Sequence, residues 1–355
     1  MTVGFCTLPL KTGHKNRGIG VYTSNLLAQF KQNPDLKVVE FETINPPPNV
    51  DLVHYPWFDF YFRTLPFFKK KPTVVTIHDT IPLIFKEGFP AGLRGKINLW
   101  LQKLSLQECK AIIVNSQDSK KNVTKYLAVP PNKITVTYLA YSRDFKILSE
   151  SQKLKIKNKF NLQDKFLLFV GDANYSKNLP FLIDSFKKIT EKFPDLKLSL
   201  VGEVFLKKVE NIDHPELRSL KETSQKIKDF GLEDKVFRPG WISDDELVGF
   251  YNLATLYIQP SLYEGFGFPV LQAFACGCPV ISSNAGALPE VVGEAGIVFD
   301  PRDQDKLVNI LTAVLNDKTI LQKMSQLGLE RAKKFSWEKT AQETIKVYEK
   351  VLADK

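Results

Sequence analysis

The chain has 355 residues, of which 43% are hydrophobic and 25% are charged. These proportions are typical of a globular protein, and the length predicts two domains of about 150 to 200 residues each. No apolar run approaches the ~20 residues of a membrane-spanning helix. Residues 1–5 resemble a first β-strand and not a signal peptide, so we expect a cytoplasmic protein.

The formal net charge of +10 is concentrated in one half of the chain. Residues 1–159 contain 24 Lys and Arg against 11 Asp and Glu, whereas residues 160–355 contain 25 against 28. The basic character therefore belongs to the first half alone. A nucleic-acid partner would account for this half but not for the acidic second half.

In the first half, the predicted strand over residues 2–6 is followed by a polar loop and by Gly18 and Gly20 at the start of a helix. A Gly-x-Gly between a strand and a helix suits the close approach of a phosphate, although a plain turn has the same signature. A dinucleotide oxidoreductase would need a third glycine and an acidic residue about 20 positions further on. This turn has only two glycines.

An insert rich in aromatic residues lies between the predicted strands 51–54 and 73–77, and it ends in Lys69, Lys70 and Lys71. Aromatic rings beside a basic run suit the interface of an anionic membrane, and they also suit stacking on sugars or single-stranded nucleic acid. The alternative is a loop whose rings pack on their own domain. A helix predicted over residues 93–110 is basic at its start and belongs by the same argument to an acceptor or membrane face.

The strand over residues 73–77 leads directly to His78. A side chain at the carboxyl end of a parallel strand points into the crevice where open α/β sheets bind ligands, and a satisfied structural histidine is the alternative. Between residues 142 and 165 the pattern gives way to charge, and we expect the interdomain linker there. Lys177 follows the next buried strand at a predicted helix start, where a lysine suits a phosphate.

The most informative stretch is residues 259–284, QPSLYEGFGFPVLQAFACGCPVISSN. A strand leads into a glycine-rich turn, and a helix is predicted to begin with Pro269 as its first residue. Such a helix N-terminus offers backbone N–H groups and a positive dipole end to an anion, above all a phosphate. Beside a phosphate, Glu264 is favourable only if it binds a neutral polyol such as a sugar, and Gln272 lies two turns on. The alternative for Glu264 is a solvated turn residue.

Two patterns suggest a metal but have simpler explanations. The four cysteines lack the paired spacing of a zinc site, so we expect reduced, buried thiols at Cys6, Cys109, Cys276 and Cys278. Asp303 and Asp305 form an Asp-x-Asp, but they begin a predicted helix, where acidic residues are expected as caps. We therefore expect no metal and no other cofactor.

The segment EGFGFPVLQAFACGCPVISSNAGALPEV resembles the donor-site signature of the retaining glycosyltransferases of family 4, and TIHDTIP at residues 76–82 resembles a variant frequent among mannosyl-type members. Strands and helices alternate in both halves, which predicts an α/β fold of two doubly wound sheets. The resemblance implies the GT-B architecture, with two Rossmann-like domains facing across a cleft. Residues 1–150 with 337–355 would form the acceptor-binding domain, because the C-terminal helix crosses back, and residues 160–336 the donor-binding domain.

The resemblance also implies roles for individual residues. Glu264 would bind hydroxyl groups of the donor sugar, and Gln272, which replaces the second glutamate of the family, would bind the ribose. The Arg-Lys-Asn of the family reads Ser176, Lys177, Asn178 here, so one positive charge is absent. The implied catalytic residues are His78, Glu264 and Lys177, and the implied donor-binding residues are Gly18, Gly20, Lys177, Trp241, Ile242, Glu264, Gly265, Phe266, Gly267, Phe268 and Gln272.

The implied function is transfer of a hexose, with mannose as the first choice, from a nucleotide diphosphate sugar to a glycan or lipid-linked acceptor in cell-surface polysaccharide synthesis. GDP-mannose is the first choice of donor and UDP-hexoses follow. The first domain is expected to contact an anionic membrane peripherally on its cytoplasmic face, and no nucleic acid is expected. Two alternatives remain: a catalytically impaired nucleotide-sugar-binding partner of an active transferase, because Gln272 and Ser176 depart from the family pattern, and a single-stranded nucleic-acid-binding protein.

Overall fold

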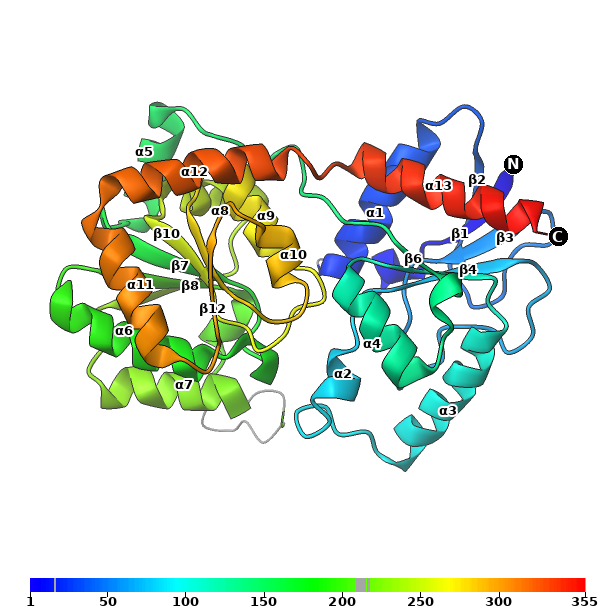
Figure 1. Cartoon of the computed structure of the whole chain (residues 1–355), viewed down its shortest axis with the longest axis horizontal. Coiled ribbons are helices and arrows are strands. Elements are labelled where there is room, and N and C mark those ends of the chain that lie inside the picture. The colour runs from blue at the N-terminus through cyan, green and yellow to red at the C-terminus, as the bar shows by residue number, and fades with distance from the viewer. Residues whose placement is uncertain (16, 209–214, 216–217, 355) are drawn as a thin grey trace. The chain divides into compact units, whose positions relative to one another are not determined.

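The computed structural model describes residues 1–15, 17–208, 215 and 218–354. The chain divides into two compact units, which we call unit 1 (Met1–Ala140 with Phe335–Lys355) and unit 2 (Tyr141–Lys334) (Figure 1). Each unit is built on one six-stranded sheet in which neighbouring strands are parallel. The α/β prediction of two doubly wound sheets is therefore confirmed.

The sheet of unit 1 has the strand order β2-β1-β3-β4-β5-β6. Its central strands are buried along their whole length, because helices cover both faces. The strands are β1 (Thr2–Cys6), β2 (Lys37–Phe41), β3 (Leu52–Tyr55), β4 (Thr73–Ile77), β5 (Ala111–Val114) and β6 (Ile134–Val136). The helices are α1 (Gly18–Lys31), α2 (Ile81–Ile84), α3 (Leu93–Gln107), α4 (Gln117–Leu127) and the C-terminal α13 (Trp337–Ala353).

The C-terminal helix α13 belongs to unit 1, where it packs against α1. A buried chain of hydrogen bonds fixes it there: the Tyr348 hydroxyl lies 2.6 Å from His54 Nδ1, and His54 Nε2 lies 2.8 Å from Thr76 Oγ1. Burial lowers the pKa of His54 to about 3, so the imidazole is neutral at physiological pH. The predicted return of the last helix to the first domain is confirmed.

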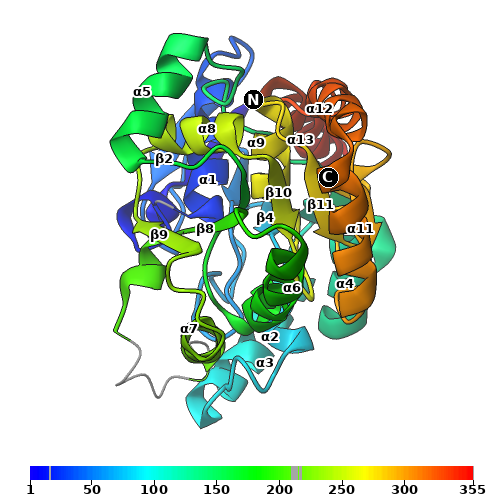
Figure 2. The ribbon, with the colours of Figure 1, turned by 90° about the vertical axis from the view of Figure 1, so that its left-hand side faces the viewer.

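The sheet of unit 2 has the strand order β12-β11-β10-β7-β8-β9. Helices α6, α7 and α11 cover one face, and α8, α9 and α12 cover the other (Figure 2). The strands are β7 (Phe166–Val170), β8 (Lys197–Val201), β9 (Val236–Gly240), β10 (Leu256–Gln259), β11 (Val280–Ser283) and β12 (Ile297–Phe299). The helices are α5 (Glu150–Phe160), α6 (Leu179–Lys192), α7 (Arg218–Asp229), α8 (Asp244–Leu253), α9 (Phe268–Ala275), α10 (Leu288–Val292), α11 (Gln304–Asn316) and α12 (Lys318–Ala332).

The interdomain linker expected over residues 142–165 is wrong, because helix α5 occupies much of this segment. Ser149 and Gln152 form a capping box at its start, and it packs on α8 through the rings of Phe160 and Phe250, 5.1 Å apart. The lysines that suggested a linker lie largely at the surface of this helix. In the described part of the chain, no helix combines the length and apolarity needed to cross a membrane.

Candidate functional site

The glycine-rich turn of unit 2 connects β10 to α9. The helix begins at Phe268, so Pro269 is its second residue. The prediction that Pro269 is the first residue is wrong. Gly267 precedes the helix with φ 107°, and a Cβ at this position would lie 2.9 Å from Leu288 Cδ2. The Val270 amide donates to the Gly267 carbonyl at 3.1 Å, which closes the first turn. The turn therefore needs glycine at position 267 for its backbone conformation.

Glu264 is a buried, hydrogen-bonded carboxylate, with only 8% of its surface exposed. Its Oε1 receives three donors: Lys177 Nζ at 2.6 Å, Ser261 Oγ at 2.7 Å and Gln259 Nε2 at 2.8 Å. Burial of an ionised carboxylate is costly unless donors replace its water, and these three do so. The alternative that Glu264 is a solvated turn residue is therefore wrong. We call these four residues the Glu264 cluster.

Gln259 and Ser261 were missed by the sequence analysis. Gln259 ends β10, and its amide donates to both Ser261 Oγ, at 2.7 Å, and Glu264 Oε1. The Tyr257 hydroxyl donates to Gln259 Oε1, and burial raises the pKa of Tyr257 well above its usual value, which keeps this donor protonated. A glutamine at the end of an otherwise apolar buried strand was the available signal.

The backbone of Glu264 is held by the loop that follows β11. The Ala287 amide donates to the Glu264 carbonyl at 2.9 Å. Gly286 has φ 61°, and a Cβ there would lie 2.4 Å from that same carbonyl oxygen. Both the side chain and the main chain of Glu264 are thus fixed by the protein before any ligand binds.

Lys177 lies in a 3₁₀ turn, Tyr175–Lys177, between β7 and α6. Lys177 lies at the start of α6 as expected, directly before Asn178, which caps the helix with φ 56°. The side-chain Nδ2 of Asn178 donates to the carbonyls of Pro260, at 3.2 Å, and Pro301, at 2.9 Å, which binds this turn to the segments after β10 and β12. Ser176 is fully buried, and its hydroxyl donates to Asn174 Oδ1 at 2.8 Å. Lys177 is therefore aimed at Glu264 by its loop.

The other candidates in unit 2 have separate surroundings. Gln272, on α9, accepts a hydrogen bond from the Tyr251 hydroxyl at 3.2 Å. Trp241 is exposed and Ile242 is at the edge of burial, in the segment between β9 and α8. The structure thus joins Lys177 to Glu264, whereas the donor-binding roles of the turn residues, Trp241, Ile242 and Gln272 stay predictions.

The candidates in unit 1 are His78, Gly18 and Gly20. His78 Nε2 lies 2.9 Å from the Pro56 carbonyl, so this nitrogen carries the proton, and the ring meets that of Tyr22 at 4.8 Å. Burial lowers the pKa of His78 to about 4, so the ring is neutral near pH 7. A Cβ at Gly20 would lie 2.2 Å from the Lys15 carbonyl oxygen, which gives this glycine a structural reason. Gly18 is the exposed first residue of α1.

The two patterns that suggested a metal have structural partners. Asp303 caps α11 by accepting from the Lys306 amide at 2.9 Å, and Asp305 accepts from Lys188 Nζ at 2.9 Å. Among the residues that the structure describes, no group of three or more His, Cys, Asp or Glu side chains is arranged to hold a metal. All four cysteines are free and buried, as predicted, and burial raises the pKa of Cys276 to about 12.

Comparisons with known proteins give the family. The family model described as Glycosyl transferases group 1 matches residues 150–331, and that of Glycosyltransferase Family 4 matches residues 18–144. The chain is 30% identical over 276 residues to the O-antigen chain mannosyltransferase B of Escherichia coli. This alignment covers 78% of this chain and 69% of that protein.

A second relative is the serotype-specific mannosyltransferase WbdA of Escherichia coli, 29% identical over 288 residues. The match covers 79% of this chain but 34% of WbdA, so the chain spans about a third of that relative. The structure of this chain is similar to that of HepE of Anabaena, which was solved with UDP-glucose. The TM-score is 0.73, and the sequences are 18% identical over 99% of this chain and 100% of HepE. Matched by the group 1 model over half of its length and by a relative at 30% identity, the chain belongs to the family of glycosyl transferases group 1, and it has the GT-B fold.

Proposed function

We propose that the chain transfers a hexose, with mannose as the first choice, from a nucleotide diphosphate sugar to a glycan or lipid-linked acceptor in cell-surface polysaccharide synthesis. The observation that carries this proposal is the Glu264 cluster, in which a buried carboxylate and an ammonium lie 2.6 Å apart beside the N-terminus of α9. Two relatives are named as mannosyltransferases, which favours mannose. Unit 2 would bind the donor and unit 1 the acceptor.

The cluster suits a bound sugar phosphate because it pairs opposite charges at one point. Oε1 of Glu264 already accepts from Lys177, so the carboxylate has its orientation fixed and can accept sugar hydroxyls without reorganising. When the glycosidic bond to the phosphate breaks, negative charge develops on the leaving diphosphate. The Lys177 ammonium and the positive end of the α9 dipole would stabilise that charge.

Retention at the anomeric carbon would follow from attack on the same face that the leaving group departs from. The leaving phosphate oxygen would take the proton of the acceptor hydroxyl as the new bond forms. His78 would lie beside the transferred sugar. Because its Nε2 proton is directed at the Pro56 carbonyl, the neutral ring offers Nδ1 as an acceptor for a hydroxyl group.

The donor can be identified by a binding screen followed by a transfer assay. A ligand that binds only the native state raises its stability by about 2.7 kcal/mol at a hundred times its Kd, so thermal shifts rank GDP-mannose against UDP-hexoses. We expect the largest shift with GDP-mannose, and UDP-glucose, which is bound in HepE, is the matched competitor. Transfer of labelled mannose to a glycan extract then tests the reaction.

The screen also tests the alternative of a catalytically impaired partner. This alternative is favoured by Gln272, which is bound to Tyr251, and by Ser176, whose buried hydroxyl occupies the place of a charged residue in the family pattern. Donor binding without hydrolysis or transfer would support it against the enzyme. A chain that binds no nucleotide sugar would contradict both.

We place the reaction at the cytoplasmic face of a membrane, with unit 1 in peripheral contact with anionic lipid.

A further inference from the structure

Helix α3 of unit 1 exposes its apolar residues to solvent. Leu93, Ile97, Trp100 and Leu104 are 77%, 51%, 61% and 39% exposed. At 100° per residue these four positions fall within about 60° of one another, so they form one stripe along the helix. The inner face is mixed, because Gln102 and Ser105 are buried there beside Leu106, which packs in the core of unit 1. The exposed stripe is therefore a second apolar face, whereas an ordinary surface helix keeps its apolar face buried.

The inward polar residues hold the aromatic loop that precedes β4. The side-chain Nδ2 of Asn98 donates to the Tyr61 carbonyl at 2.8 Å. Gln102 Nε2 donates to Thr64 Oγ1 at 2.7 Å, and the Ser105 hydroxyl donates to the Pro66 carbonyl at 2.8 Å. Two of these acceptors are backbone carbonyls of the loop, and α3 satisfies them. Helix and loop thus form one fixed element. Because these polar side chains face the loop, the apolar stripe on the opposite side of the helix faces solvent.

The loop adds its own exposed rings to this element. Three rings of the insert, Trp57, Phe58 and Phe60, are buried in the core of unit 1. They agree with the alternative that the rings of this loop pack on their own domain. Phe62 and Phe68 are 72% and 81% exposed, and Phe67 lies against Phe68 with ring centroids 5.2 Å apart. The insert is therefore divided between rings that pack on their own domain and rings that face solvent.

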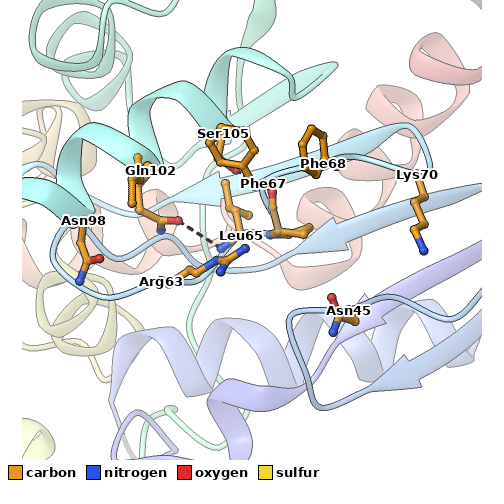
Figure 3. A pocket seen from close by; sticks show the side chains of 11 residues that line it. Asn45, Arg63, Leu65, Phe67, Phe68, Lys70, Asn98, Gln102 and Ser105 are labelled. Carbon is orange, nitrogen blue, oxygen red and sulfur yellow. Dashed lines mark hydrogen bonds between the residues drawn. The ribbon is translucent and has the colours of Figure 1, made fainter.

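A cavity of about 440 Å³ lies between the loop and α3, next to the apolar stripe. Figure 3 shows Gln102 of α3 bonded to Leu65, with Arg63 beside it and with Phe67, Phe68 and Lys70 further along the loop. Leu101, which also lines the cavity, adjoins the stripe because it follows Trp100 and lies one turn from Ile97 and Leu104. Two cations, Arg63 and Lys70, therefore stand beside a wall of exposed rings.

The element formed by α3 and the loop carries a net positive charge. Helix α3 contains three basic residues and no acidic one, and residues 59–71 contain four basic residues and one acidic one. Lys96 and Lys103 lie along one edge of the stripe, where long lysine chains can lie over apolar surface and keep their charge in water. An apolar stripe edged by cations is the pattern of a helix that lies in the interface of an anionic bilayer.

We propose that this element docks the chain on an anionic lipid bilayer. The docking surface consists of Phe62, Phe67, Phe68, Leu93, Ile97, Trp100 and Leu104, with Arg63 and Lys70 at the cavity. The rings and aliphatic chains lie at headgroup depth, and the two cations meet a lipid phosphate in the cavity. This deepens the proposed function by giving the chain a route to a lipid-linked acceptor, and it rests on that function only for the nature of the acceptor.

Two other occupants fit the surface less well. Single-stranded nucleic acid gains its binding energy from stacking on rings, and it would leave the aliphatic Leu93, Ile97 and Leu104 of the docking surface without a stacking partner. A second copy of this chain would bring two surfaces of the same positive sign together, which is unfavourable. A bilayer with anionic headgroups complements both the apolar stripe and the charge.

The test is binding of the full-length chain to vesicles of phosphatidylcholine with and without phosphatidylglycerol, measured by flotation. We expect binding only with the anionic lipid and a marked loss when salt is raised, because screening weakens surface attraction. The double variant Ile97→Ser with Trp100→Ser should bind about tenfold more weakly, since it removes apolar area from the interface. The variant Arg63→Gln with Lys70→Gln should lose the preference for anionic lipid.

The matched control is Leu154→Ser with Lys155→Gln on α5, because Leu154 is 56% exposed on an equally basic helix of unit 2. It should bind vesicles as the parent does. All variants change exposed or cavity side chains, and thermal unfolding verifies that each is folded. Equal loss in the control, undiminished binding of the Ile97 and Trp100 variant, no binding at all, or binding to single-stranded oligonucleotide in place of vesicles would overturn the proposal.

Vesicle binding is read out without any sugar donor, so the two proposals fail separately. If the chain binds anionic vesicles but no nucleotide sugar, the docking surface stands and the proposed function falls. If it binds and transfers the sugar but ignores vesicles, the docking surface is removed and the function stands.

Discussion

The Glu264 cluster of unit 2 and the docking surface of unit 1 handle burial in opposite ways. In the cluster, an ionised carboxylate is buried and its lost hydration is replaced by three donors on one oxygen. On the docking surface, four large apolar side chains of one helix lie in water while its polar side chains bind a loop.

The difference separates two kinds of functional signal. A buried charge is stable only when its partners are in place, so the Glu264 cluster is complete in the absence of ligand and gains selectivity from its fixed geometry. The exposed apolar stripe is left largely uncovered by the described residues of unit 1 and is stabilised further when something outside covers it. The first predicts large effects on catalysis, and the second predicts effects on location.

The largest effect is expected from Lys177→Ala, which breaks the cluster at its charge. Removal of one group that stabilises developing negative charge typically costs about 10² to 10³ in kcat. We expect a loss of this size in sugar transfer, with a smaller loss of stability because Glu264 keeps its other two donors. Kinetics with labelled donor measure the first, and denaturant unfolding measures the second.

The matched control for that change is Lys187→Ala, since Lys187 lies in the neighbouring helix α6 and pairs at the surface with Glu191 at 3.7 Å. It should leave transfer unchanged. Transfer by Lys177→Ala at the rate of this control would remove Lys177 from the site.

Acid should destabilise unit 1 through His54, which is buried, and His78, which is half-buried. Burial lowers the pKa of His54 to about 3 and of His78 to about 4, from an ordinary value of 6.5. Between pH 6.5 and 4 the unfolded chain binds more protons than the native one, so the free energy of unfolding falls as pH falls, by up to about 1.4 kcal/mol per pH unit for each group.

Hydrogen exchange at pH 7 and pH 5 measures this loss unit by unit. We expect protection to fall in β3 and β4 of unit 1 more than in β10 of unit 2. The variant His54→Gln should have a shallower dependence on pH over this window. Equal loss in both units, or an unchanged slope in the variant, would contradict the assignment of the effect to these histidines.

Part of this comparison could be predicted from the sequence. The turn at Glu264 and the position of Lys177 after a buried strand were identified from local pattern, because strand, glycine turn and helix signals are encoded in adjacent residues. Their direct pairing was not, since it depends on how Asn178 binds two carbonyls far along the chain. Contacts of this kind are set by tertiary packing, which local pattern does not describe.

Helix α3 and helix α5 show a second reason for the limits of prediction. Periodicity identifies the apolar stripe of α3 but not whether it faces the core, because the stripe looks the same in either orientation. In α5, the high density of lysines was interpreted as a linker, although the capping box of Ser149 and Gln152 is the sequence pattern of a helix start. In both cases the deciding contact lies in another part of the unit.

A moderate effect is expected when the carboxylate loses a positioning partner. Gln259→Leu keeps the size of the side chain but removes the amide that donates to Glu264 and Ser261. It also leaves the Tyr257 hydroxyl without its acceptor, so we expect a loss of about 1 to 3 kcal/mol in stability. Because Gln259 acts through Glu264, kcat/KM should fall about tenfold.

The variant Gln259→Glu distinguishes positioning from structure. It keeps an acceptor for Tyr257 but brings a second carboxylate beside Glu264, so transfer should fall and the pH profile should shift as the pair titrates. If Gln259→Leu lowers stability while kcat/KM stays at the parent value, Gln259 supports the fold alone.

The smallest effect is expected from Gln272→Glu, which restores the second carboxylate of the family pattern. Gln272 Oε1 accepts from the Tyr251 hydroxyl, and burial raises the pKa of Tyr251 well above its usual value, so this donor stays protonated and suits a carboxylate equally. A carboxylate accepts from both ribose hydroxyls, whereas the amide has one acceptor oxygen. We expect nucleotide affinity to rise about three- to tenfold with little change in kcat, because the ribose is remote from the reacting bond. Calorimetric titration with GDP and UDP checks this, with Gln326→Glu on the outer helix α12 as the control for added charge. Unchanged affinity would show that Gln272 binds Tyr251 alone and that the ribose lies elsewhere, so that only the first turn of α9, and not its second, would contact the nucleotide.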